Sequence, residues 1–178
     1  MIILKDCLTH VSNGMALRTI LTFASFYIIK IYATKWDLYI VLPIVLTILD
    51  AVDNFFIKYS VISQGYNILQ GTNCTKKSKE SLYYQVNDKI IDILSYVLCY
   101  TYFYKELNDP LLELFIIHRM IGIILFITTH KKYFLVICFD FVKEYMLYKY
   151  LFASNYNYLP LCVILKIIFE YVLHLFIN

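Results

Sequence analysis

Apolar residues fill most of this chain in long runs, and short polar segments separate the runs. Six runs have about the 20 residues that a helix needs to cross a bilayer. They cover residues 15–34, 38–57, 87–104, 110–129, 133–152 and 158–177. Because lipid offers no partners to backbone N–H and C=O groups, such runs are predicted to be helices. The pattern therefore predicts an all-α membrane protein, with six transmembrane helices in a single domain over residues 1–178.

Two segments fall outside this pattern. Residues 1–13 mix apolar and polar positions, which is typical of a short helix lying in the membrane interface. Residues 59–86 form the most polar stretch and hold Gly65, Gly71 and Asn73, so we expect a polar insert between the second and third helices.

Composition and charge support a membrane protein and set its orientation. Hydrophobic residues make up 61% of the chain and charged residues 16%, whereas soluble domains have about 45–50% and about 25%. The net charge of +3 is small and scattered, which does not indicate a nucleic-acid partner. With both termini cytoplasmic, nine basic residues lie on the inside: Lys5, Arg18, Lys58, Lys76, Lys77, Lys79, Lys89, Lys131 and Lys132. Four lie outside: Lys30, Lys35, Lys105 and Lys149. The positive-inside rule then favours an N-in, C-in topology with a cytoplasmic insert.

Four aspartates stand where charge is most costly. Asp50 and Asp53 lie late in the second run, and Asp88 and Asp92 open the third. On helices the first pair is spaced i,i+3 and the second i,i+4, so each pair shares one face. Ionisable residues in membrane helices mark function by default. The predicted topology places both pairs at the cytoplasmic face of neighbouring helices.

Crowded carboxylates of this kind need counter-charge. Their oxygens are hard ligands that suit Mg²⁺ or Mn²⁺. Two such ions would neutralise the group and hold a diphosphate between them, and one carboxylate left over would act as a general base. A site at the boundary of water and lipid suits a substrate with a nucleotide end and a lipid end.

Two sequence motifs around these aspartates resemble the signature of the CDP-alcohol phosphotransferases. Asp50-Ala-Val-Asp53-Asn54-Phe-Phe-Ile57-Lys58 is similar to the family pattern D-x-x-D-G-x-x-A-R. Tyr84-Gln-Val-Asn-Asp88-Lys-Ile-Ile-Asp92 is similar to G-x-x-x-D-x-x-x-D. All four acids keep the family's local spacing, and that family has six membrane helices with the motif running from the second into the third. This chain departs at both Gly positions, at the Ala and at the Arg, and its two motifs lie further apart.

The resemblance implies a role for each matching residue. Asp50, Asp53 and Asp88 would bind two Mg²⁺ or Mn²⁺ ions, and Asp92 would add a ligand or act as the catalytic base. Asn54 and Lys58 fall where the family binds nucleotide and diphosphate. The implied reaction transfers a phosphatidyl or phospho-alcohol group from a CDP-linked lipid, CDP-diacylglycerol for a chain this short, to a small polar alcohol and releases CMP. It further implies phospholipid synthesis among membrane lipids, and a homodimer.

Other charges in the apolar runs leave alternatives open. His118 and Arg119 lie in the middle of the fourth run, where they would contact a phosphate or the acceptor, or where Arg119 would pair with an aspartate of the second or third helix. Asp140, Lys143 and Glu144 have helical spacing and would either neutralise one another or line the acceptor site.

Lys166 and Glu170 are spaced i,i+4 and are predicted to form an ion pair. The main alternative function is a catalytically inactive relative that serves as a membrane scaffold or lipid-binding protein, motivated by the replaced glycines and the long insert. An intramembrane prenyltransferase is disfavoured by the number of spans, and a transporter by the absence of a helix pair interrupted by Gly or Pro.

Overall fold

A computed structural model describes residues 4–34, 37–63, 81–153 and 155–172. Within these ranges every regular element is a helix. The helices are α1 (Leu4–Tyr32), α2 (Leu38–Ser63), α4 (Leu82–Leu107), α5 (Pro110–Thr129), α6 (Tyr133–Ile137), α7 (Val142–Phe152) and α8 (Leu159–Tyr171). The predicted all-α class is confirmed for the part of the chain described.

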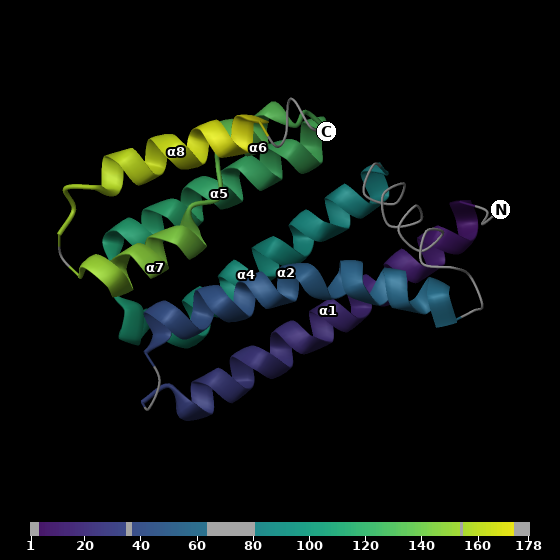
Figure 1. Cartoon of the computed structure of the whole chain (residues 1–178), viewed down its shortest axis with the longest axis horizontal. Coiled ribbons are helices and arrows are strands. Elements are labelled where there is room, and N and C mark those ends of the chain that lie inside the picture. The colour runs from purple at the N-terminus through teal and green to yellow at the C-terminus, as the bar shows by residue number, and fades with distance from the viewer. Residues whose placement is uncertain (1–3, 35–36, 64–80, 154, 173–178) are drawn as a thin grey trace.

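The helices pack as two neighbouring groups. In the first group α1 contacts both α2 and α4, and in the second α5 contacts α6 and α7 while α8 packs on α6 (Figure 1). The groups meet where α2 contacts α7 and α4 contacts α5. Figure 1 shows α1 beginning and α8 ending toward the same side of the molecule.

Three of the described helices are long and apolar enough to cross a membrane, over Thr9–Tyr32, Leu38–Tyr59 and Pro110–Thr129. At 1.5 Å per residue, a helix of 20 residues spans about 30 Å, the thickness of the hydrocarbon layer. α4, with 26 residues, is also long enough to cross a membrane, but it carries five charged residues: Asp88, Lys89, Asp92, Lys105 and Glu106. Length and composition therefore support a membrane protein.

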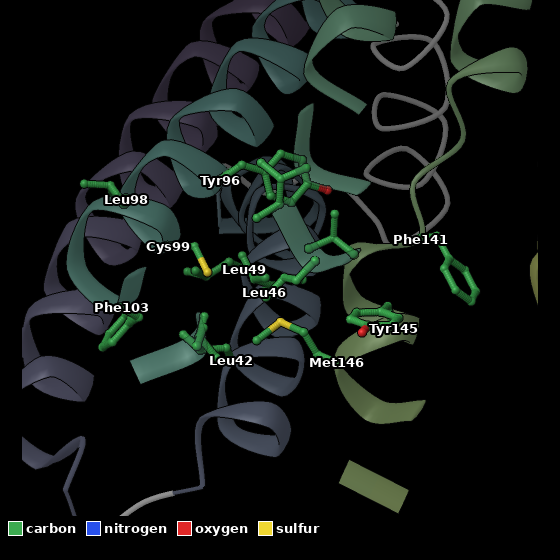
Figure 2. Close-up of a cluster of buried hydrophobic side chains, with 14 of the residues drawn as sticks. Leu42, Leu46, Leu49, Tyr96, Leu98, Cys99, Phe103, Phe141, Tyr145 and Met146 are labelled. Carbon is green, nitrogen blue, oxygen red and sulfur yellow. The ribbon is translucent and has the colours of Figure 1, made fainter. Parts of the chain in front are cut away.

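One large apolar core joins the two helix groups. Figure 2 shows Leu46 and Leu49 of α2 lying between Cys99 of α4 and Met146 of α7, and all four side chains are buried. A second, smaller cluster joins α1, α2 and α4 nearer the start of α1. It consists of Val11, Met15, Ile57, Tyr84 and Ile91.

Local sequence signals set several helix ends. The Ser81 hydroxyl accepts a hydrogen bond from the Tyr84 N–H at 3.2 Å and caps the start of α4. Asp109 caps α5 in the same way through the Leu111 N–H, and Pro110 follows in the first turn, where a missing N–H costs nothing. α5 ends at Thr129, because the next residue, His130, has a left-handed φ of 58° that stops the helix.

Asp109 also ties the helices together at the end of the molecule away from the start of α1. Its buried carboxylate accepts hydrogen bonds from the Tyr145 hydroxyl at 3.0 and 3.1 Å, and Lys149 lies 3.2 Å away. The Tyr39 hydroxyl donates to the Leu107 carbonyl next to it. These contacts join α2, α4, α5 and α7.

Two predictions about helix boundaries are wrong. α1 runs from Leu4 to Tyr32 without interruption, so residues 4–13 are not a separate interfacial helix. The predicted fifth helix over 133–152 is broken, because α6 ends at Ile137 and α7 begins only at Val142. The predicted insert is also shorter, since α2 continues to Ser63 and α4 starts at Leu82; residues 64–80 lie outside the described residues.

Candidate functional site

Three of the four predicted aspartates meet at one side chain, Arg18 of α1. Its Nη2 donates to Asp50 Oδ1 at 2.6 Å and to Asp92 Oδ1 at 2.8 Å. Its Nη1 donates to Asp88 Oδ1 at 2.5 Å. Charge-assisted bonds of this kind are the strong ones, and a planar guanidinium holds several acceptors in fixed directions. Arg18 therefore joins α1, α2 and α4.

Two lysines complete the group. Lys89 Nζ donates to Asp88 Oδ2 at 2.7 Å and to Asp92 Oδ2 at 2.8 Å, and Lys143 of α7 donates to Asp50 Oδ2. We call these six side chains the central charge cluster: Arg18, Asp50, Asp88, Lys89, Asp92 and Lys143. It holds three carboxylates and three cations, so its described charges balance.

Apolar packing lies on both sides of the central charge cluster. Along α1 and α2, residues of the small apolar cluster and of the large core flank it: Met15 and Phe26 around Arg18, and Leu49 and Ile57 around Asp50. The Arg18 side chain is 1% exposed, whereas Asp50 is 37% and Lys143 21% exposed. The cluster is thus closed around Arg18 and most open where α2 meets α7.

A small recess adjoins this open edge. It is lined by Leu46, Asp50, Asp92, Ser95, Tyr96 and Lys143, and it has about 180 Å³ of empty space when the part open to solvent is included. Its enclosed part has room for about one water molecule. A larger ligand therefore needs Lys143 or its neighbours to move.

The carboxylate oxygens of the central charge cluster are chemically suited to bind a divalent cation. Asp50, Asp88 and Asp92 present hard oxygen ligands around one shared positive group, which is the donor type that Mg²⁺ and Mn²⁺ prefer. Those oxygens are turned toward Arg18 and the lysines, and among the described residues no group of three or more Asp, Glu, His or Cys is arranged around a common metal position. A metal would therefore have to take the place that Arg18 and Lys143 hold.

The other predicted motif residues are not seen in the cluster. The side chains of Asp53 and Asn54 lie outside the description, although both residues belong to α2. Lys58 is exposed, two turns further along α2 than Asp50.

Arg119 and His118 have different surroundings. The Arg119 side chain is buried on α5, and its Nη1 donates to the carbonyls of Leu135 and Cys138 at 3.1 and 3.0 Å. Those carbonyls lie at the end of α6, where the helix break removes their helical partners, and Arg119 donates hydrogen bonds to them. Asp140, and Asp92 of α4, also lie within electrostatic reach of its guanidinium. His118 is half-buried with its ring edge-on to Phe139.

Asp140, Lys143 and Glu144 have hydrogen-bond partners on three different helices, although Asp140 and Lys143 stay within electrostatic reach of each other. Asp140 is buried in the break and accepts a hydrogen bond from the Tyr96 hydroxyl at 2.5 Å. Lys143 reaches Asp50 on α2, and Glu144 accepts from Lys166 of α8 at 2.5 Å. Each side chain therefore binds a different helix.

The predicted ion pair of Lys166 with Glu170 is confirmed at 3.2 Å. Lys166 thus bridges Glu144 and Glu170 and fixes α8 to α7.

Sequence reasoning assigned Arg18 and Lys89 to the basic residues that set topology and missed their contacts. The available signal was position: Arg18 lies within an apolar run, and a charge there requires a partner. Lys89 stands directly between the two aspartates of its own helix.

Fold and site together define an all-helical protein, with helices apolar enough to span a membrane, that buries a balanced cluster of aspartates and cations. No protein-family model, no curated protein and no solved structure matches this chain.

Proposed function

We propose that this protein transfers a phosphatidyl or phospho-alcohol group from a CDP-alcohol, CDP-diacylglycerol in the first place, to a hydroxyl acceptor. One observation carries the proposal: Asp50, Asp88 and Asp92, from two helices and with the motif spacing, meet around the buried Arg18 guanidinium of an all-helical protein. Carboxylates gathered at that depth are costly unless they have a use.

In the proposed reaction the acceptor oxygen forms a bond to the β-phosphorus of the donor. The bond from that phosphorus to the CMP oxygen breaks, and CMP leaves with the electron pair. Asp92 accepts the proton of the acceptor hydroxyl. Asp50, Asp53 and Asp88 would hold two Mg²⁺ or Mn²⁺ ions, which stabilise negative charge that develops on the phosphoryl oxygens.

We also propose six membrane crossings with both termini in the cytoplasm. α1, α2, α4 and α5 supply four crossings, the broken pair α6 and α7 the fifth, and α8 the sixth. The broken crossing is tolerable in lipid because Arg119 satisfies the carbonyls of Leu135 and Cys138. The central charge cluster then faces the cytoplasmic side, where a nucleotide is available.

A catalytically inactive relative is the second candidate. The observation that favours it is charge balance: each described carboxylate of the cluster already has a cation within 2.8 Å. In such a protein the six charges would fix helix positions, and the protein would act as a membrane scaffold or bind lipid.

One assay separates the two candidates. Purified full-length protein in detergent is given CDP-diacylglycerol, Mg²⁺ or Mn²⁺ and a panel of small alcohols, and CMP release is followed. The transferase predicts release that requires metal, stops on chelation, and is lost in Asp92→Asn but kept in Asp37→Asn, whose carboxylate is exposed. Release that is indifferent to metal, or no release with any alcohol, contradicts the transferase.

A further inference from the structure

We infer that a divalent metal and the diphosphate of the substrate bind to the central charge cluster together, the metal to its carboxylates and the diphosphate to its cations. Lys143 is the first of these cations to leave its aspartate and pair with the diphosphate. This inference rests on the proposed function and names the diphosphate partners of the same site. It replaces Lys58, which is exposed and lies apart from the cluster, as the nearest candidate for a cationic partner.

The charge balance makes joint entry necessary. A divalent metal that took the carboxylates of Asp50 and Asp92 would give the balanced cluster an excess of positive charge, because Lys143 would lose Asp50 and Arg18 would keep Asp88 alone, which it shares with Lys89. A diphosphate that took Arg18 and Lys143 would leave Lys89 as the one cation of the described cluster beside three carboxylates. Either ligand alone therefore breaks ion pairs and leaves uncompensated charge in the cluster, which is unfavourable. Both ligands together restore a partner to every group.

The geometry indicates where exchange begins. Lys143 and Asp50 form the most exposed pair of the central charge cluster, at 21% and 37%, whereas Arg18 is 1% exposed. Both also line the recess between α2, α4 and α7. Because the enclosed recess has room for only about one water, Lys143 must swing away from Asp50 before a phosphate can enter.

Joint entry has a thermodynamic signature. If diphosphate raises the affinity for metal by some factor, metal must raise the affinity for diphosphate by the same factor. We expect a factor of at least about ten, within the ~5–150-fold usual for coupled sites. Removing Lys143 should strengthen binding of metal alone, because Asp50 then has one cationic partner fewer for the metal to displace, and should reduce the coupling.

The test measures equilibrium binding of Mn²⁺ to the purified full-length protein by electron paramagnetic resonance. Mn²⁺ is titrated alone, with CDP and with inorganic pyrophosphate, and protein-free samples correct for Mn²⁺ bound to the anion in solution. The variants are Lys143→Ala, Lys143→Arg, which keeps the charge, and Lys149→Ala as a matched control on the same helix. Circular dichroism establishes that each variant is helical.

The inference is supported by weak Mn²⁺ binding alone, binding at least about tenfold tighter with CDP or pyrophosphate, and coupling that falls in Lys143→Ala but not in Lys149→Ala. It is overturned if Mn²⁺ binds equally with and without the anion, if Mn²⁺ does not bind at all, or if Lys143→Ala leaves the coupling unchanged. The wild-type comparison decides by itself if Lys143→Ala does not fold. Coupled binding without CMP release would contradict the proposed transfer and support joint binding of metal and diphosphate. CMP release without coupled binding would support the transfer and contradict joint binding.

Discussion

Replacing Arg18 by alanine should destabilise this protein more than any other single loss of charge in α1. Arg18 is 1% exposed and donates to aspartates on both α2 and α4 at 2.5–2.8 Å. Without it, Lys89 and Lys143 remain to compensate three carboxylates, of which Asp88 and Asp92 are 19% and 11% exposed and Asp50 37%, so the described cluster carries an excess of one negative charge.

The size of the effect follows from what remains. Removing one partner of a buried ion pair costs about 3–5 kcal/mol, and here the remaining charge lies between two apolar clusters. Arg18→Lys should cost less, because it keeps the charge while losing the planar fork that reaches three carboxylates. Arg18→Ala combined with Asp88→Asn should also be less destabilised than Arg18→Ala alone, since the double variant restores neutrality.

The assay is unfolding of the purified protein in detergent, followed by circular dichroism as temperature or denaturing detergent rises. Lys30→Ala is the matched control on the same helix. Lys30 pairs with Glu106, but the two side chains are 40% and 37% exposed, so the loss should stay below about 1 kcal/mol. If Arg18→Ala costs no more than Lys30→Ala, Arg18 does not hold the central charge cluster together and the described geometry is refuted.

Two further substitutions test the broken helix. Gly122→Ala should destabilise the protein by about 1–3 kcal/mol, because the added Cβ would lie 2.2 Å from the Cys138 Cβ and α5 would have to move away from the end of α6. A thermal midpoint equal to that of the wild type would show that α5 and α6 do not pack so closely. Tyr96→Phe should cost about 1.5–3 kcal/mol by removing a hydrogen bond to the buried Asp140 carboxylate, while Tyr27→Phe, at an exposed position, should change stability by less than about 0.5 kcal/mol; equal effects in the same unfolding assay would refute the Tyr96 contact.

The helices were predictable wherever an apolar run was uninterrupted. The predicted helix over 110–129 matches α5 at both ends, because Asp109 and Pro110 signal its start. α2 ends several residues later than predicted, and α4 begins and ends several residues outside its predicted range. The predicted ranges covered only the apolar run, whereas each helix continues through polar residues at its ends.

The break between α6 and α7 was only partly predictable from its own segment, where Asp140 is the one residue of a type that starts helices. Residues 138–141 contain neither Gly nor Pro, and they are mostly apolar. One contact that holds the break is local, because the Asp140 carboxylate accepts a hydrogen bond from the Val142 N–H at 3.3 Å where α7 begins. Others involve α5, where Gly122 permits close approach to Cys138 and Arg119 donates to the freed carbonyls. A sequence pattern reports local periodicity, so it cannot show a partner that lies some 16–19 residues away on a neighbouring helix.

Convergence of the aspartates could be predicted from spacing and topology, but their partners could not. Arg18 reaches Asp50 and Asp88 across 32 and 70 residues of sequence. Charge counting treated it as a marker of the cytoplasmic side, whereas it is buried in the bundle. Arg18 is buried and Lys89 half-buried, and both pair with aspartates within the bundle, so seven basic residues remain on the inside against four outside.

Stability alone does not explain why six charges are buried together. Well-packed apolar residues of similar volume often serve a protein core as well as buried ion pairs do, or better. The chain nevertheless places the central charge cluster between two apolar clusters that already hold α1, α2 and α4. It also leaves one edge, Asp50 with Lys143, partly open beside a recess. A purely structural cluster has no need of an open edge, whereas a site that exchanges partners with a metal and a diphosphate requires one.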